Sequence, residues 1–314
     1  MITIQRILCP TDLTQEADEA LRYAVALTSA CGAKLFLLYC KEGKSDGHEN
    51  GKATVATSSV FTESLAPHLG LNTFSDLDWQ GLIAENVDDV GKAILNAAVS
   101  QKIDLIVMRS RRRPHAAILL GSTAETVCRS ATCPVLVTHP REREWVGFST
   151  GEIDLQRILV AYDFSSDAEV ALNYALSFAQ KYQTKLHLLH MLTKADQGEP
   201  KFAWLQKTEN AYNQAARKLQ RTIPSEALPW SQIRTEVRCG KVYQEVLAYA
   251  KEHQIDLICL GAHGSDFSLR ALFGSNVDRI LRQAPCPVLI ARPIKLADLP
   301  SSANEEIRLG MHSR

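Results

Sequence analysis

Short runs of apolar residues alternate with longer segments whose apolar residues recur at helical spacing. In the second half of the chain this pattern predicts five β-strands, at 158–161, 185–191, 232–238, 257–260 and 288–291. Between the first two strands, one helical face collects Ala168, Ala171, Leu172, Ala175, Phe178 and Ala179. Apolar strands separated by amphipathic helices favour a parallel sheet with helices on both faces, so we expect a doubly wound α/β fold.

The pattern occurs twice along the chain. Four segments match in the same order: 6–12 with 157–163, 34–38 with 185–189, 103–107 with 255–259 and 133–137 with 286–290. A period this long predicts whole domains rather than a solenoid, whose units span roughly 20 to 50 residues. We therefore predict two tandem α/β domains, each with a five-stranded parallel sheet flanked by helices. The divisions are a domain at 1–140, a polar linker at 141–154, a domain at 155–295 and a tail at 296–314. Residues 41–57 are polar and are expected to form a loop.

The composition changes this picture little. The chain has 314 residues, of which 46% are hydrophobic and 22% charged, as in soluble globular proteins. Its formal net charge is zero, which argues against nucleic acid as a partner. The chain opens without a signal-like apolar segment and contains no apolar stretch of membrane-spanning length, so we expect a cytoplasmic protein that does not enter membranes. Its eight cysteines form no CxxC pair and are expected to be mostly buried thiols, with a metal or redox site at Cys9 and Cys40 as the minor alternative.

The candidate chemistry lies after the strand at 257–260. Gly261-Ala262-His263-Gly264 follows that strand, and nine residues later Gly274-Ser275 precedes a predicted helix. Glycine lets backbone N–H groups approach a ligand closely, and a helix N-terminus adds unpaired donors and a partial positive charge. The spacing therefore predicts a phosphate site at this end of the strand.

These residues resemble the universal stress proteins of the ATP-binding type. The family motif is GxxG, nine residues, then G followed by S or T, and Asp163, the DLI run at 256–258 and the CPVL strand at 286–289 are also family-like. The resemblance implies that Asp163 accepts hydrogen bonds from the ribose, that Ala161 and Met191 contact the adenine, and that the glycine loop surrounds the phosphates. It implies ATP with Mg²⁺ or Mn²⁺ bound through the phosphates. The full set of residues expected at the nucleotide is Ala161, Asp163, Met191, Leu260, Gly261, Gly264, Gly274, Ser275 and Asn276.

Each of these residues also has a purely structural interpretation. Ser275 with Asp278 has the spacing of a helix N-cap pair, and Asp163 could cap the helix that begins near Ser165. Gly274 could be a turn glycine, and His263 is interpreted as a solvated loop residue. The sequence contains no Walker motif, no GxSxG and no HExxH, so we expect little or no catalysis, at most slow ATP hydrolysis or autophosphorylation.

The first domain departs from the motif. Arg109 and Arg112 stand in the places of Gly261 and Gly264, although Gly121-Ser122 and Asp12 are retained. At these positions the backbone must approach the phosphate closely, and an arginine side chain would occupy the space that the phosphate needs. We therefore predict no ATP binding in this domain. The cluster of Arg109, Arg111, Arg112 and Arg113 could instead hold another anion or an acidic partner, or be a solvated loop.

The resemblance also implies how the domains assemble. In the family, the fifth strands of two domains pair, and here the candidate edges are Val135–Thr138 and Val288–Ala291. We expect that pair to form within the chain, and a homodimer of two chains is compatible with it. The leading hypothesis is an ATP-binding stress-response regulator with one site, in the second domain, that acts on an unknown protein partner. The alternative is a scaffold or sensor that binds a non-nucleotide anion or a protein through the first domain.

Overall fold

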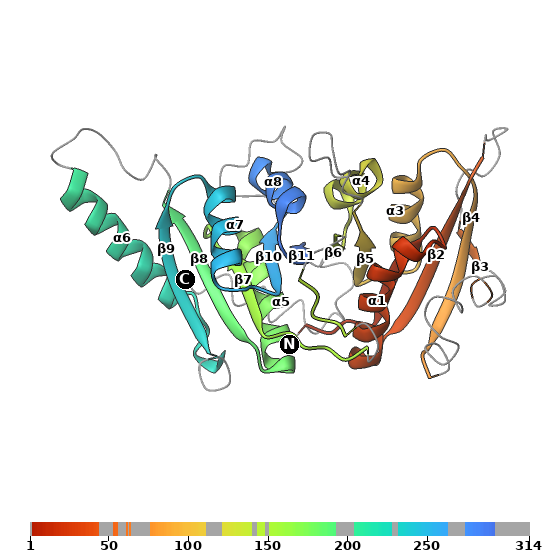
Figure 1. Ribbon diagram of the computed structural model, residues 1–314, viewed down its shortest axis with the longest axis horizontal. Coiled ribbons are helices and arrows are strands. Elements are labelled where there is room, and N and C mark those ends of the chain that lie inside the picture. The colour runs from red at the N-terminus through yellow and green to blue at the C-terminus, as the bar shows by residue number, and fades with distance from the viewer. Residues whose placement is uncertain are drawn as a thin grey trace, which may run out of the picture.

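The computed structural model describes residues 2–43, 53–55, 61, 63, 76–110, 121–139, 143–147, 151–192, 204–227, 232–262 and 274–292. One continuous sheet runs through the molecule with helices on both faces (Figure 1). Its strand order is β3-β4-β2-β1-β5-β6-β11-β10-β7-β8-β9. We call residues 2–139 the N-terminal repeat and residues 155–292 the C-terminal repeat.

The N-terminal repeat contributes the first six strands of that order. They are β1 (Arg6–Thr11), β2 (Lys34–Glu42), β3 (Ala53–Val55), β4 (Trp79–Val87), β5 (Leu105–Arg109) and β6 (Val135–Thr138). Its helices are α1 (Asp18–Cys31), which follows a short 3₁₀ turn at Gln15–Ala17, α3 (Val90–Ser100) and α4 (Ser122–Ser130).

The C-terminal repeat contributes the other five strands, all mutually parallel. They are β7 (Arg157–Ala161), β8 (Lys185–Leu192), β9 (Ile233–Cys239), β10 (Leu257–Gly261) and β11 (Val288–Ala291). Its helices are α5 (Ser166–Tyr182), α6 (Trp204–Arg221), α7 (Val242–Glu252) and α8 (Ser275–Gln283), and a 3₁₀ turn lies at Ser225–Ala227. The doubly wound α/β fold with tandem halves is confirmed, and the helical face predicted at Ala168 to Ala179 is buried.

One strand was not predicted. Ala53–Val55 forms β3, which pairs antiparallel with β4 at the edge of the sheet, inside the segment expected to be a loop. Thr54 and Val55 are exposed, so this strand carries no buried apolar face that the sequence pattern could reveal.

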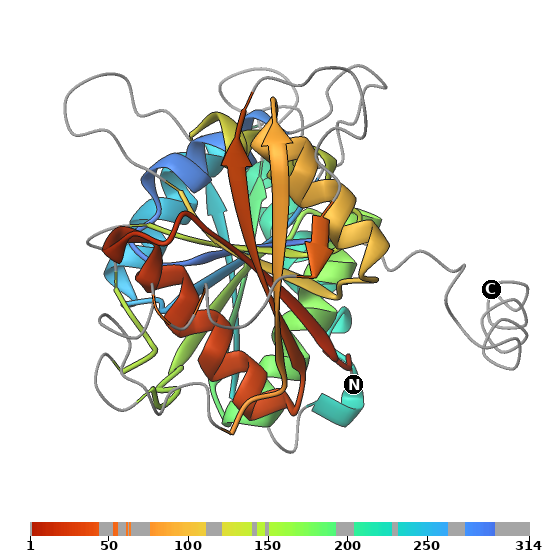
Figure 2. The same cartoon turned by 90° about the vertical axis from the view of Figure 1, so that its right-hand side faces the viewer.

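The two repeats share their sheet through the fifth strands. β6 and β11 pair antiparallel, with Leu136 opposite Leu289, and all residues of both strands are buried. The predicted pairing of Val135–Thr138 with Val288–Ala291 is thereby confirmed. Two hydrophobic clusters, one on each face, each contain residues of both repeats. Residues of α1 and α5 belong to one cluster, and residues of α3, α4, α7 and α8 to the other; Figure 2 shows α1 and α3 on opposite sides of the sheet.

The segment expected to be a polar linker contains a buried anchor. Trp145 is 2% exposed, its ring meets Tyr23 of α1 edge-on at 4.7 Å, and its backbone N–H donates to the Tyr23 hydroxyl at 3.2 Å. Arg143 donates its backbone N–H to the carbonyl of Pro285 at 2.8 Å and lies 3.7 Å from Asp256. The segment therefore packs against both repeats as well as linking them along the chain. Among the described helices, none is both long and apolar enough to cross a bilayer.

Candidate nucleotide site

The predicted site residues of the described chain lie along one edge of the sheet. Ala161 is the last residue of β7, Gly261 is the last of β10, and Met191 is one residue from the end of β8. β7 lies between β8 and β10, and all three strands are parallel. Their carboxyl ends therefore meet where the strand order reverses, which is where ligands bind in open α/β sheets. Gly264 and His263 lie outside the described residues.

The apolar members of the predicted site share one face. Met191 and Leu260 belong to the hydrophobic cluster that α7 and α8 cover, and Ala161 packs against the same cluster. Met191 and Leu260 are buried, whereas Ala161 is half-buried. Of these three, Ala161 is therefore the most accessible apolar surface for a ring placed at this edge.

Asp163 holds the start of α5. Its Oδ1 accepts from the backbone N–H of Ser165 at 3.0 Å and from the Ser165 hydroxyl at 2.5 Å. Ser165 is the N-cap and accepts from the N–H of Ala168 at 3.2 Å, and Phe164 between them has a left-handed φ of 64°. The interpretation of Asp163 as the helix cap is therefore wrong: Ser165 is the cap, and Asp163 supports it from two residues before.

The same turn recurs in the N-terminal repeat. Asp12 accepts from the N–H of Thr14 at 3.1 Å and from its hydroxyl at 2.6 Å, and Leu13 has a φ of 60°. In both repeats the aspartate after the first strand therefore stabilises the turn that leads into the first helix.

Gly261 is required by packing of the strand end against a helix. A Cβ at this position would lie 2.7 Å from the carbonyl carbon of Asp167 and 2.8 Å from the nitrogen of Ala168, both in the first turn of α5. Real Cβ atoms do not approach backbone so closely, so a side chain at 261 would displace the helix start.

The start of α8 has no side-chain cap. Gly274 is the N-cap residue and Ser275 is already helical, so the predicted cap pair of Ser275 with Asp278 is wrong. Ser275 lies one residue after the N-cap position and therefore cannot cap the helix. Asp278 forms an ion pair with Arg282, one turn later, at 2.7 Å. The N-cap glycine therefore provides no side-chain acceptor for the first N–H groups of the helix, and Ser275 is exposed and Asn276 half-buried beside them. Such groups are the donors that bind phosphate at helix termini.

Two residues that the sequence analysis missed stand between α7 and α8. The Arg279 guanidinium lies 4.7 Å from the centre of the Tyr243 ring, and Tyr243 packs against the cluster that also contacts Ala161. In the N-terminal repeat the equivalent residues are Gly91 and Thr126, and a Cβ on Gly91 would lie 2.7 Å from the Thr126 Cβ. Helices α3 and α4 therefore touch directly where α7 and α8 are spaced by side chains. A position-by-position comparison of the two halves would have shown this exchange.

The equivalent edge of the N-terminal repeat is filled by an ion pair. Arg109, in the place of Gly261, lies 3.5 Å from Glu19 of α1, and the two side chains are only 18% and 12% exposed. The helix start differs accordingly, since Gln15–Ala17 is a 3₁₀ turn and α1 begins at Asp18, whereas α5 is helical from Ser166. Gly261 packs directly against the first turn of α5, whereas Arg109 places a side chain at the equivalent point of the N-terminal repeat.

The surroundings of that ion pair are polar. Ser110 and Thr138 are buried there, in the places of Ala262 and Ala291. Burial raises the pKa of Glu19, and the Arg109 charge opposes that effect. Arg109 is therefore directed inward and is not part of a surface cluster; Arg111, Arg112 and Arg113 lie outside the described residues.

The fold and the edge just described define a tandem doubly wound α/β protein in which both repeats have an uncapped helix start at the carboxyl edge and one of them fills the adjoining strand end with an ion pair. The model of the universal stress protein family matches residues 3–139 and 155–292, and the chain belongs to that family.

The comparisons agree on the tandem arrangement. Universal stress protein Slr1230 of Synechocystis is 23% identical in an alignment covering 92% of this chain and 100% of that protein. A universal stress protein structure from Archaeoglobus fulgidus has a TM-score of 0.64 at 22% identity, covering 92% of this chain and 97% of the other. The structure of PA1789 from Pseudomonas aeruginosa, described as functionally unknown, has a TM-score of 0.66 at 18% identity, covering 98% of each chain. At these identities the structures establish the fold.

Proposed function

We propose that this protein is a stress-response regulator that binds one ATP, in the C-terminal repeat, and performs little or no catalysis. The observation that carries the proposal is that the uncapped start of α8 lies at the same sheet edge as Asp163 and Ala161, beside a strand end where Gly261 has no side chain, whereas Arg109 and Glu19 fill the equivalent place in the N-terminal repeat. A phosphate chain laid across the N–H groups of Ser275 and Asn276 would satisfy donors that no side chain caps.

The remaining contacts follow from the placement of the residues. The adenine would lie against Ala161, with Met191 and Leu260 beneath it, and Asp163 would accept from the ribose while still supporting Ser165. Within the described chain, no group of three His, Cys, Asp or Glu side chains could hold a metal ion. A Mg²⁺ or Mn²⁺ ion that arrives with ATP would accordingly take its ligands from phosphate oxygens and water, as hard cations at nucleotides do.

The N-terminal repeat is proposed to bind no nucleotide. Its ion pair between Arg109 and Glu19 occupies the strand end, and α3 and α4 meet without a gap at Gly91. The proposed location is the cytoplasm, since all eight cysteines are free, as expected in a reducing compartment. Binding of ATP would then change the surface around α7 and α8 that a protein partner contacts.

Isothermal titration of the full chain with ATP and Mg²⁺ tests the proposal. We expect one nucleotide per chain. Asp163→Asn should weaken ATP binding about tenfold, the value of one charge-assisted hydrogen bond. The matched variant Asp12→Asn changes the same turn in the other repeat and should leave ATP affinity unchanged. Two sites per chain, or equal losses in both variants, would contradict the proposal, and no binding at all would refute it.

A further inference from the structure

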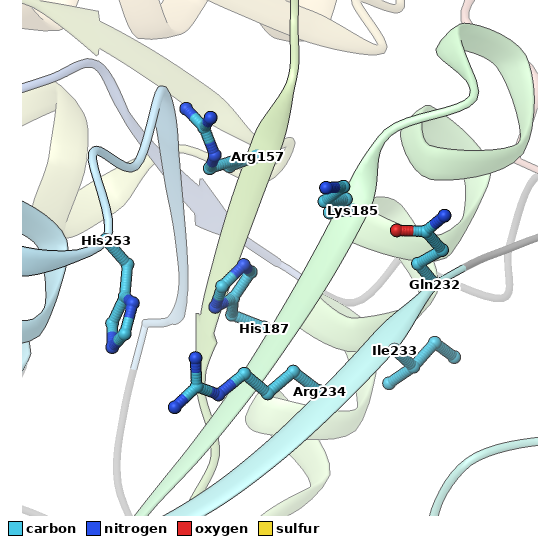
Figure 3. A pocket seen from close by; sticks show the side chains of 7 residues that line it. All are labelled: Arg157, Lys185, His187, Gln232, Ile233, Arg234 and His253. Atoms are coloured by element: carbon cyan, nitrogen blue, oxygen red, sulfur yellow. The ribbon is translucent and has the colours of Figure 1, made fainter.

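The amino edge of the sheet in the C-terminal repeat carries a basic hollow that the nucleotide proposal does not use. It measures about 370 Å³ and is lined by Arg157, Lys185, His187, Gln232, Ile233, Arg234 and His253 (Figure 3). Arg157, Lys185 and Ile233 are the first residues of β7, β8 and β9. The hollow therefore lies at the end of the strands opposite to Ala161 and Asp163, about 15 Å away for a five-residue strand.

We propose that this hollow is a second ligand site, which binds a small phosphate-bearing anion. The site is separate from the nucleotide site and independent of it.

Two cations in the hollow form no ion pair within 4 Å among the described residues, although the Asp256 carboxylate attracts the charge of Arg157. Neither Arg157 nor Lys185 forms an ion pair with a carboxylate there, and the one side-chain hydrogen bond of Arg157 goes to the carbonyl of Gln254 at 3.4 Å. The nearby carboxylate of Asp256 is buried, accepts from the backbone N–H groups of Gln156 and Arg157, and lies 3.7 Å from Arg143.

The third cation is shared with a carboxylate. Arg234 lies 3.0 Å from Glu236, which also pairs with Arg238 at 2.8 Å. His253 lies 3.5 Å from Glu252. The charge that faces the hollow is thus positive, and its source is mainly Lys185 and Arg157. Lysine and arginine in this setting make charge-assisted hydrogen bonds to phosphate oxygens.

A buried neutral imidazole gives the hollow a directed polar contact. His187 is 7% exposed, and its Nδ1 lies 2.9 Å from the hydroxyl of Tyr249. Burial and the neighbouring positive charges lower the pKa of His187 to about 4, so the ring is neutral at physiological pH. Figure 3 shows His187 between His253 and Lys185, with the Arg234 guanidinium beside it. When the Tyr249 hydroxyl donates to Nδ1, the ring proton lies on Nε2, which no described residue bonds and which can donate to a ligand oxygen.

The N-terminal repeat shows which residues are specific to this site. It has arginine and lysine at the same strand starts, Arg6 and Lys34, but Phe36 replaces His187. The cations of Arg6 and Lys34 lie 5.9 and 5.7 Å from the centre of the Phe36 ring.

Those cations also have other partners. Lys34 is 3.6 Å from Asp78, and Arg6 donates to the carbonyl of Gln101 at 2.8 Å. In addition, Gln80 and Gln101 stand where the C-terminal repeat has Arg234 and His253. Basic strand starts are common to both repeats, whereas His187, Arg234 and His253 are particular to the C-terminal repeat.

The ligand class follows from these donors. Cations on β7, β8 and β9 approach from different directions, which suits the tetrahedrally arranged oxygens of a phosphate better than a planar carboxylate. The volume admits a small phosphorylated molecule rather than a macromolecule.

The test is an NMR titration of the full chain with pyrophosphate, observing the imidazole resonances of His187 and His253. We expect both to shift on binding, and Lys185→Gln should weaken that response about tenfold, as for loss of one charge-assisted contact. Lys34→Gln makes the same change at the equivalent position of the other repeat and should leave the response unaltered. Because Lys185 is exposed, its replacement leaves the fold intact.

Three outcomes would overturn the proposal. The first is that pyrophosphate leaves both imidazoles unmoved. The second is that the response survives unchanged in Lys185→Gln, which would place the anion elsewhere, for example at α8. The third is that succinate produces the response as strongly as pyrophosphate, which would make the site one for dianions in general and not for phosphates.

Discussion

At the carboxyl edge of the sheet, the two repeats have the same backbone features but different side chains. Both have an aspartate that supports the first helix, a left-handed residue after it, and a glycine N-cap without a side-chain bond, Gly121 or Gly274. Around this shared frame, Gly261, Val170, Ala262 and Ala291 of one repeat are replaced by Arg109, Glu19, Ser110 and Thr138 of the other. The backbone thus preserves the fold, while a few side chains decide whether an ion pair fills the strand end.

Removing one half of the ion pair should have the largest effect. Arg109→Leu leaves the Glu19 carboxylate buried without its cation, which should lower the free energy of unfolding by about 3–5 kcal/mol at neutral pH. The loss should shrink at acidic pH because Glu19 then takes up a proton. Urea unfolding followed by circular dichroism measures it.

The double variant Arg109→Leu/Glu19→Leu is the matching control. It removes both charges and should recover most of the stability, since apolar residues of similar volume replace buried ion pairs well. A double variant as unstable as Arg109→Leu would show that the arginine acts through packing and not through its charge.

The second comparison concerns His187 and Phe36. The pKa of His187 is about 4 in the folded protein and about 6.5 in an unfolded chain, so the unfolded state binds more protons between these values. Stability should therefore be full above pH 6.5 and fall by at most about 3 kcal/mol as the pH drops to 4. His187→Phe, which installs the residue of the other repeat, should flatten this part of the curve. His190→Gln, three residues further along β8, should keep it, and a slope that persists in His187→Phe would assign it to other groups.

The sequence predicted the elements that have a periodic apolar pattern and missed the contacts that depend on single residues. Buried strands such as β7 and β10 are continuous apolar runs, and their order follows from the parallel crossover rule. Trp145 was missed because a single buried aromatic in a polar segment has no periodicity. The cap at Ser275 was misplaced by one residue because serine after glycine looks like a cap in any sequence. The ion pair of Arg109 was not predicted because its partner, Glu19, is distant in the chain and no local pattern connects them.

Substitutions at Gly261 and Gly274 should have smaller effects on stability and test the close contact between β10 and α5. Gly261→Ala should cost about 1–3 kcal/mol, because its Cβ would lie 2.7 Å from the backbone of Asp167. Gly274→Ala should stay within about 1 kcal/mol, since that Cβ would meet Val277 at an ordinary 3.5 Å and φ is −62°. Equal costs at the two positions, measured by denaturant unfolding, would show that the close approach of β10 to α5 is not what requires glycine.

The smallest expected change in stability concerns the spacing of α7 and α8. Arg279→Thr installs the residue of the N-terminal repeat and removes a contact between guanidinium and ring that is worth about 0.5–1 kcal/mol at an exposed site. Tyr243, in the first turn of α7, then loses the guanidinium that lies over its ring, so ATP affinity should fall severalfold while the fold survives. Thr126→Arg, the reverse exchange on α4, should not create ATP binding, because Arg109 and Glu19 still fill the strand end. If Arg279→Thr leaves ATP affinity intact, the spacing of the helices has no part in the difference between the repeats, and the ion pair of Arg109 with Glu19 accounts for it alone.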